Sequence, residues 1–130
     1  MERVDFLRLA KARAAMVLFA ITAAFCVFAG CNAARRKSDQ ELGLTAQQAA
    51  GRRLYDNYCD RCHEPYSSSD KQGPSLQGVF KKPYLAESGL PANDARVGEI
   101  IKLGRSKMRG FGDVLSEQQV QDLLAYLHTL

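Results

Sequence analysis

Hydrophobic residues recur at helical spacing most clearly near the C-terminus of the chain. The apolar positions there lie three or four residues apart, at Val120, Leu123, Leu124 and Leu127. This spacing places them on one face of an α-helix. Ser116, followed three residues later by Gln119, has the pattern of a capping box at a helix N-terminus. The sequence therefore predicts a helix from Ser116 to the C-terminus.

Two further helices are predicted upstream. Thr45, followed three residues later by Gln48, forms a second capping-box pattern and starts a helix that reaches Cys59. Another helix is predicted over Asp94 to Leu103. It stops at Gly104, because glycine commonly terminates helices. No alternating pattern typical of strands occurs. We therefore expect an all-α domain over residues 45–130.

A long irregular stretch, Tyr66 to Asn93, separates the first two predicted helices. It contains a serine cluster and three prolines, which interrupt regular structure. A loop of this length ordinarily counts against a compact domain. A large apolar cofactor would give the loop a surface to pack on.

The first thirty residues have the features of an export signal. Four basic residues within Met1–Arg13 precede seventeen uncharged residues from Ala14 to Gly30, and this order is typical of a signal peptide. The segment before Cys31 resembles the cleavage site of bacterial lipoproteins, except that Phe28 stands where leucine is usual. The resemblance implies that Cys31 becomes the lipidated N-terminus.

Two alternatives stay open for this leader. Seventeen apolar residues lie at the short end of what spans a bilayer, so residues 1–30 could remain as a signal anchor. Ordinary cleavage would instead release a soluble product. All three cases export the domain to the periplasm or cell exterior, and two tether it to a membrane. Residues 31–44 are polar and aperiodic, so we expect a flexible tether there.

The net charge of +4 does not favour nucleic acid as a partner. Four basic and two acidic residues precede Cys31, so fourteen basic and twelve acidic residues remain from there onward. This small excess gives no strong positive field.

The most specific chemical signal is Cys59-Asp60-Arg61-Cys62-His63. Two thiols at this spacing can each form a thioether with one vinyl group of a haem, and the adjacent imidazole can bind the iron. A zinc site would need a second ligand pair, and a thioredoxin-like site would need a βαβ pattern; neither is evident. The motif predicts one haem c, covalently bound through Cys59 and Cys62.

Residues 45–130 resemble a small monohaem cytochrome c with histidine and methionine ligands. Gly51 and Tyr55 lie eight and four residues before Cys59, where this family has a glycine and an aromatic residue. Leu123 and Tyr126 match the residues of the last helix that pack against them. A glycine allows two helices to cross closely. The resemblance implies a compact cytochrome c fold of three to five helices wrapped around one haem.

The resemblance also implies the residues around the iron. His63 is the first axial ligand, and Met108, the only methionine outside the leader, is the expected second ligand. His128 is its competitor and is otherwise expected at the surface. The carbonyl of Pro74, in Gly73-Pro74-Ser75-Leu76, is expected to accept a hydrogen bond from the His63 ring.

One departure concerns the loop that presents the second ligand. The family often has proline after the methionine, whereas this chain reads Met108-Arg109-Gly110-Phe111. Without the proline we expect a less stiff loop. A hypothesis is that Arg109 offsets this loss by a charge-assisted hydrogen bond to a haem propionate.

The function implied is one-electron transfer between membrane-associated respiratory or oxidoreductase partners, with iron cycling between Fe(III) and Fe(II) and no enzymatic activity of its own. One alternative is a haem subunit of one dehydrogenase or oxidase. Another is a gas-binding or peroxide-reducing haem protein, if Met108 does not bind the iron. Basic residues near the expected haem edge either steer an acidic partner or form a solvated face: Lys81, Lys82, Lys102, Arg105 and Lys107.

Overall fold

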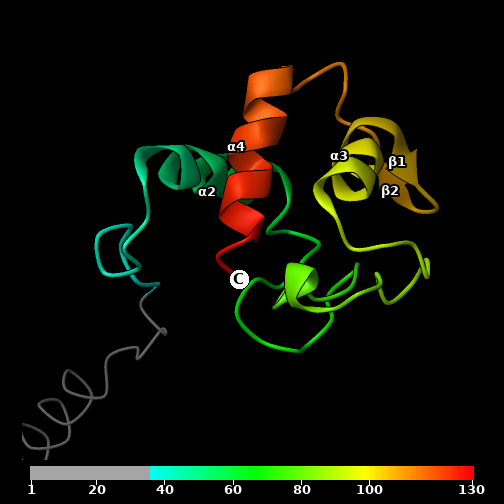
Figure 1. The fold of residues 1–130 in the computed structure, drawn as a ribbon, viewed down its shortest axis with the longest axis horizontal. Helices are drawn as coiled ribbons and strands as arrows, with labels where there is room; N and C mark the ends of the chain where they lie inside the picture. The colour runs from blue at the N-terminus through cyan, green and yellow to red at the C-terminus, as the bar shows by residue number, and fades with distance from the viewer. Residues whose placement is uncertain (1–35) are drawn as a thin grey trace, which may run out of the picture. The chain divides into compact units, whose positions relative to one another are not determined.

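The computed structural model describes residues 36–130, and Lys37–Leu130 form one compact unit. The predicted signal segment and Cys31 lie outside the described residues. The elements in chain order are α2 (Ala46–Tyr58), the 3-10 helix η1 (Val79–Lys81), α3 (Asp94–Leu103), β1 (Gly104–Arg105), β2 (Met108–Arg109) and α4 (Glu117–Leu127). Figure 1 shows α4 between α2 and α3.

The prediction of a mainly helical domain is confirmed, with one correction to the all-α class. β1 and β2 form an antiparallel hairpin that pairs Gly104 with Arg109 and Arg105 with Met108. Each strand has only two residues, which is too short for an alternating hydrophobic pattern to be visible in the sequence.

The three α-helices within residues 36–130 begin at side-chain caps. The predicted capping boxes of Thr45 and Ser116 are both present. α3 is capped by Asn93, whose Oδ1 accepts the backbone N–H of Arg96 at 3.0 Å. α3 ends at Gly104, whose φ of 78° lies in the region that favours glycine. These caps satisfy backbone N–H groups that have no partner within the helix.

The crossing of α2 and α4 forms one half of the core. Gly51 lies at the crossing, where an added Cβ would fall on the Asp122 carbonyl oxygen and lie 2.9 Å from Tyr126 Cβ. The Tyr55 and Tyr126 rings meet edge-on with centroids 5.4 Å apart. The structure thus gives the glycine and the aromatic residues the packing roles that the sequence predicted for them.

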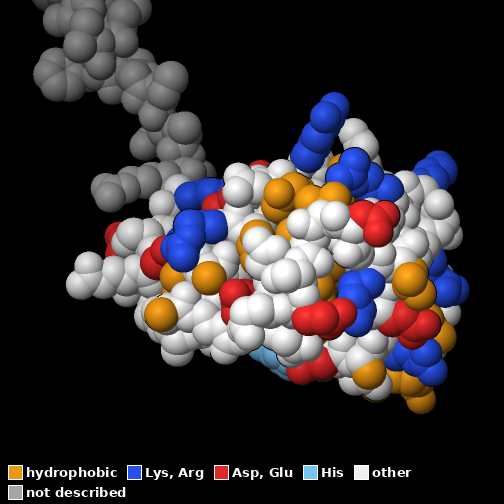
Figure 2. All heavy atoms as spheres, turned by 90° about the horizontal axis from the view of Figure 1, so that it is seen from above, with side chains coloured by type: hydrophobic (Ala, Val, Ile, Leu, Met, Phe, Trp, Pro, Cys, Tyr) orange, Lys and Arg blue, Asp and Glu red, His pale blue; other side chains and the backbone are white. Residues whose placement is uncertain are grey.

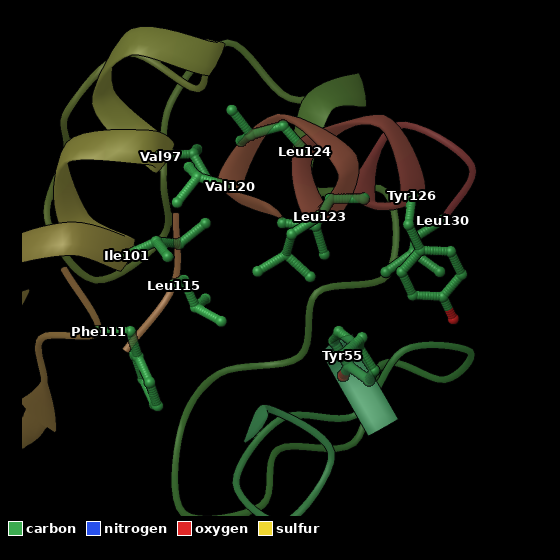
Figure 3. Close-up of a cluster of buried hydrophobic side chains, with 11 residues drawn as sticks. Tyr55, Val97, Ile101, Phe111, Leu115, Val120, Leu123, Leu124, Tyr126 and Leu130 are labelled. Atoms are coloured by element: carbon green, nitrogen blue, oxygen red, sulfur yellow. The ribbon is translucent and has the colours of Figure 1, made fainter. Parts of the chain in front are cut away.

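The other half of the core joins α3 and the loop before α4 to the side of α4 that carries Val120 and Leu124. In Figure 3, Val97 of α3 lies beside Val120 of α4, and Tyr55 and Tyr126 lie together on the other side of the cluster. The buried cluster consists of Tyr55, Val97, Ile101, Phe111, Leu115, Val120, Leu123, Leu124, Tyr126, Leu127 and Leu130. α4 therefore contributes to both halves and holds them together.

The segment before α2 is bound to the domain, which differs from the flexible tether expected over residues 31–44. Arg52 is 7% exposed, and its guanidinium contacts Asp39 Oδ1 at 2.7 Å and the Lys37 carbonyl at 2.6 Å. Leu44 packs against the core. The compact unit accordingly begins at Lys37 rather than at Thr45. In the part of the chain that the structure covers, no helix is long and apolar enough to span a membrane.

Candidate functional site

The two thiols and the imidazole of the motif share one turn at the end of α2. Cys59 is the C-cap of this helix. Its carbonyl accepts the backbone N–H groups of Cys62 and His63, both at 2.9 Å. Both cysteines are free thiols. The turn therefore presents two sulfur atoms and a ring from a short, hydrogen-bonded piece of backbone.

The orientation of the His63 ring is set by the segment Gly73-Pro74. Nδ1 lies 2.8 Å from the Pro74 carbonyl oxygen, and because a carbonyl only accepts, Nδ1 carries the proton. This leaves the lone pair of Nε2 available to a metal. Gly73 lies against the ring, since a Cβ there would be 2.5 Å from His63 Cε1. Its backbone N–H also donates to the Cys62 carbonyl at 2.8 Å.

Tyr55 supports the same histidine from the core. Its hydroxyl donates to the His63 carbonyl oxygen at 2.8 Å. The sequence predicted the ring of Tyr55 as packing but missed this hydrogen bond. It also missed the close approach of Gly73 to the imidazole. The family resemblance gave the Pro74 carbonyl as the partner of the His63 ring, whereas glycine before proline by itself indicates only a turn.

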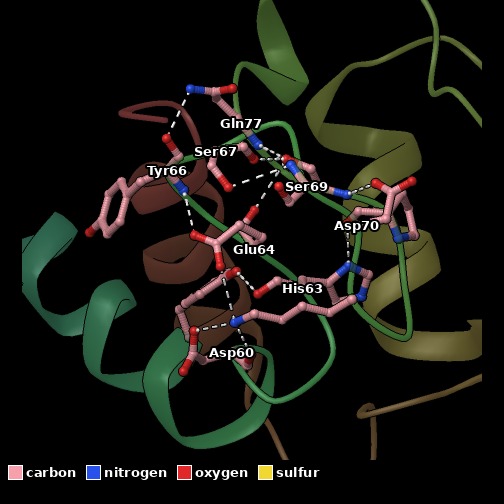
Figure 4. A network of polar contacts seen from close by, with 12 residues as sticks. Asp60, His63, Glu64, Tyr66, Ser67, Ser69, Asp70 and Gln77 are labelled. Carbon is pink, nitrogen blue, oxygen red and sulfur yellow. Dashed lines mark hydrogen bonds and ion pairs between the residues drawn. The ribbon is translucent and has the colours of Figure 1, made fainter. Parts of the chain in front are cut away.

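A polar network fixes the start of the irregular loop to the motif (Figure 4). Lys71 Nζ contacts the Asp60 carboxylate at 3.2 Å and the Glu64 carboxylate at 3.3 Å. Asp70 Oδ1 accepts the backbone N–H of Ser75 at 2.8 Å. The loop is therefore held beside His63 by hydrogen bonds and ion pairs of the chain itself.

The Cys59 thiol is unsuited to thiol–disulfide chemistry. Burial, and to a lesser degree the charges of Cys62 and Asp60, raise its pKa to about 12. Reactive redox cysteines have lowered pKa values instead. Among residues 36–130, no group of three or more His, Cys, Asp and Glu side chains could hold a metal ion.

Met108 is presented by the β1–β2 hairpin, apart from the turn that carries His63. It is half-buried and packs against the same core cluster as Cys59. Ser106 lies in the tip of the hairpin with φ of 50°. Gly104 and Gly110 allow the two arms to meet, because a Cβ on Gly104 would lie 2.5 Å from the Gly110 nitrogen. The hairpin thus fixes the backbone of Met108.

The expectation of a less stiff methionine loop stays a prediction, but the segment after Met108 has contacts that proline does not supply. Beyond the hairpin, the Phe111 N–H donates to the Ile101 carbonyl at 2.9 Å. The Arg109 guanidinium lies 4.8 Å from the centre of the Phe111 ring, and that ring meets Tyr58 edge-on at 5.9 Å. These contacts restrain the segment without proline. The contact of Arg109 with a propionate stays a prediction.

His128, the competing ligand, has other partners. Its Nε2 lies 2.6 Å from Asp94 Oδ1, and its ring stacks on Phe80 with centroids 3.9 Å apart. Its side chain is 48% exposed. The structure places it at the surface, where it links α4 to the start of α3.

The comparisons with known proteins agree with this arrangement. Residues 46–127 match the family described as "Cytochrome C oxidase, cbb3-type, subunit III". The chain belongs to this family of c-type cytochrome domains. It is also similar to a "Cytochrome c6-like" protein of Nostoc sp. (strain PCC 7120 / SAG 25.82 / UTEX 2576), 34% identical over 77 residues, which are 59% of this chain. The match spans 65% of that relative's length. No solved structure matches the chain significantly.

The family implies a covalently bound haem c, and the residues present fit one. Thioether formation consumes two free thiols at this spacing, and Cys59 and Cys62 supply them. Iron needs a neutral imidazole nitrogen, and the bond from Nδ1 to Pro74 reserves Nε2 for that role. Met108 adds a soft thioether on a restrained hairpin. When bound, the haem supplies one reversible electron at its iron.

Proposed function

We propose that this domain transfers single electrons through one haem c, bound by Cys59 and Cys62 and ligated by His63 and Met108. The observation that carries the proposal is the 2.8 Å contact between His63 Nδ1 and the Pro74 carbonyl. It fixes the ring and its tautomer, and it strengthens the ring as a donor. The cytochrome c family supports an electron carrier rather than an enzyme.

The protein's own residues keep the site ready for electron transfer. Pro74 and Gly73 hold one ligand in place, and the hairpin holds the other, so neither ligand has to move when the charge on the iron changes. Two protein ligands leave no coordination position for substrate. The thioether of Met108 raises the potential relative to a second imidazole. The domain therefore suits reversible single-electron exchange.

The surroundings of the domain are part of the proposal. We propose that residues 1–30 export the chain and that lipid on Cys31 tethers it to a membrane, facing the periplasm or cell exterior. Redox partners are then membrane-associated complexes. The matching family is described as a subunit of a cbb3-type oxidase, which supports the second candidate, a haem subunit of one oxidase complex.

Mass spectrometry and optical spectra of the exported protein test the haem site. We expect the mass of one haem on a peptide that contains Cys59 and Cys62, and a sulfur-to-iron charge-transfer band in the ferric spectrum. The reduced protein should not bind carbon monoxide at neutral pH, because both axial positions are taken. An unmodified peptide would refute the haem, whereas carbon monoxide binding with haem present would favour a gas-binding protein.

Basic residues on the hairpin suit a negatively charged partner. Arg105, Lys107 and Arg109 are exposed, and the neighbouring Leu103 is 74% exposed. On the face drawn in Figure 2, basic and acidic side chains are interspersed. We propose that the hairpin attracts an acidic surface and that Leu103 makes apolar contact there.

Salt dependence tests this attraction. Lys107→Gln should slow reduction of ferricyanide, an anionic oxidant, by the ferrous protein about two- to threefold at low ionic strength, and the difference should vanish at high salt. Arg53→Gln, which removes an equal charge from exposed α2, is the matched control. Equal effects of the two variants would mean that net charge alone is responsible.

A further inference from the structure

Residues 37–44, which precede α2, are folded onto the domain as a closed turn (Figure 1). The backbone N–H and the hydroxyl of Ser38 both donate to the Glu41 carboxylate, each at 2.7 Å. Leu44 packs against the core at the end of the turn. The turn lies outside residues 46–127, which match the family. The family match therefore does not account for it.

One buried arginine of α2 fastens this turn to the domain. The Arg52 guanidinium contacts Asp39 Oδ1 at 2.7 Å and the Lys37 carbonyl oxygen at 2.6 Å. Arg52 is 7% exposed, and charge-assisted hydrogen bonds shielded from water are strong. If the turn left the domain, the guanidinium would lose both partners. We call Arg52 and the turn of residues 37–44 the clasp.

We propose that the clasp sets the reach of the lipid tether and so directs electron transfer to redox groups close to the same membrane surface. This inference rests on the proposed function, because it needs the lipid on Cys31. Lys37 lies six positions after Cys31, and a chain of that length spans at most about 20 Å. With the turn released, the tether would extend to Thr45, fourteen positions after Cys31, and would span up to about 50 Å.

A shorter tether keeps the domain at a higher effective concentration beside the membrane. Effective concentration falls roughly as the −3/2 power of tether length, so a tether of fourteen residues instead of six lowers it about three- to fourfold. A soluble partner reaches the domain by diffusion and does not depend on the tether. Arg52 is therefore a positioning residue, which acts through the distance to the partner and separates membrane-bound from soluble partners by rate.

The test uses the full lipidated, haem-loaded chain in its ferrous form, in phosphatidylcholine vesicles at high salt. A ferrocenium-labelled lipid in the same vesicles is the one-electron oxidant. Asp39→Ala removes a carboxylate from the clasp at a side chain that is 42% exposed, so the core keeps its packing. We expect this variant to be oxidised about threefold more slowly by the lipid. Oxidation by dissolved ferricyanide should keep the wild-type rate, because high salt screens the change of charge.

Trypsin cleavage reports on the clasp itself. Trypsin cuts after lysine, and the carbonyl of the Lys37–Ser38 bond is the one that Arg52 holds. Because the turn must open before the bond can be cut, the cleavage rate follows the population of the open form. We expect cleavage at this bond to be about tenfold faster in Asp39→Ala, with a product that begins at Ser38 by mass spectrometry.

Glu99→Ala is the matched control, because it also removes an exposed carboxylate that pairs with an arginine. The Glu99 carboxylate lies 2.7 Å from the Arg96 guanidinium on α3, away from the tether in sequence. Both the cleavage rate and the oxidation rate should keep their wild-type values. Faster cleavage of Asp39→Ala together with a wild-type rate of oxidation by the lipid would overturn the proposal. Unchanged cleavage of Asp39→Ala would overturn it as well.

Two measurements on the wild-type sample separate this result from failure of the proposed function. A pyridine haemochrome shows whether the haem is covalently bound, and the mass of the N-terminal peptide shows whether Cys31 carries lipid. Protein that lacks haem or lipid overturns the proposed function and the inference with it. Protein that carries both, and whose Asp39→Ala variant keeps the wild-type rate with the labelled lipid, overturns the inference alone.

Discussion

Replacement of Met108 by alanine should lower the midpoint potential of the haem-loaded protein by on the order of 0.2 V, within the ~0.8 V that axial ligands span. A thioether is a soft, neutral donor that favours ferrous iron, and alanine offers no donor. The sulfur-to-iron charge-transfer band, at the long-wavelength end of the ferric spectrum, should disappear. The reduced variant should bind carbon monoxide, because one axial position opens.

Two further variants make this result specific to the sulfur atom. Leu103→Ala changes an exposed side chain that precedes the same hairpin, so it should leave both the potential and the band unchanged. Met108→His supplies a second imidazole, which should lower the potential without allowing carbon monoxide to bind. If Met108→Ala keeps the band and the wild-type potential, another residue is the ligand and the assignment of Met108 fails.

The helices could be predicted from the sequence because their signals are local. The capping boxes at Thr45 and Ser116 need only residues three positions apart, and both are present. The contact between His63 and Pro74 joins residues eleven positions apart. It was expected from the resemblance to a family and not from any local pattern. Hydrophobic periodicity and capping patterns therefore predicted the helices. The family resemblance predicted the contact between His63 and Pro74.

The features that escaped prediction depend on long-range packing. The β1–β2 hairpin forms because Gly104 and Gly110 allow its two strands to approach closely. Neither glycine by itself predicts a hairpin. Likewise, the polar segment before α2 reads as a tether until buried Arg52 binds Asp39 and the Lys37 carbonyl. A charged residue in a helix pattern usually predicts a solvent-facing position. Its burial here could be seen only once the partner segment was placed.

Gly51→Ala should destabilise the haem-loaded domain by about 3 kcal/mol, at the upper end of what overpacking usually costs. The added methyl group would fall on the Asp122 carbonyl and lie 2.9 Å from Tyr126 Cβ. A backbone carbonyl cannot turn aside as a long side chain can, so α2 and α4 must separate. For a domain of this size, that loss corresponds to a melting temperature lower by roughly 10–25 °C.

Gly98→Ala is the matched control for this prediction, because Gly98 is also a buried glycine within a helix. An added Cβ there would meet Leu124 Cδ1 at 3.5 Å and Val120 Cγ1 at 3.8 Å, which are ordinary contacts. The better helix propensity of alanine should then raise stability by up to ~1 kcal/mol. Opposite shifts of the two melting temperatures would show that the closeness of the α2–α4 crossing, rather than glycine in a helix as such, decides the effect. A Gly51→Ala variant as stable as Gly98→Ala would contradict the close crossing.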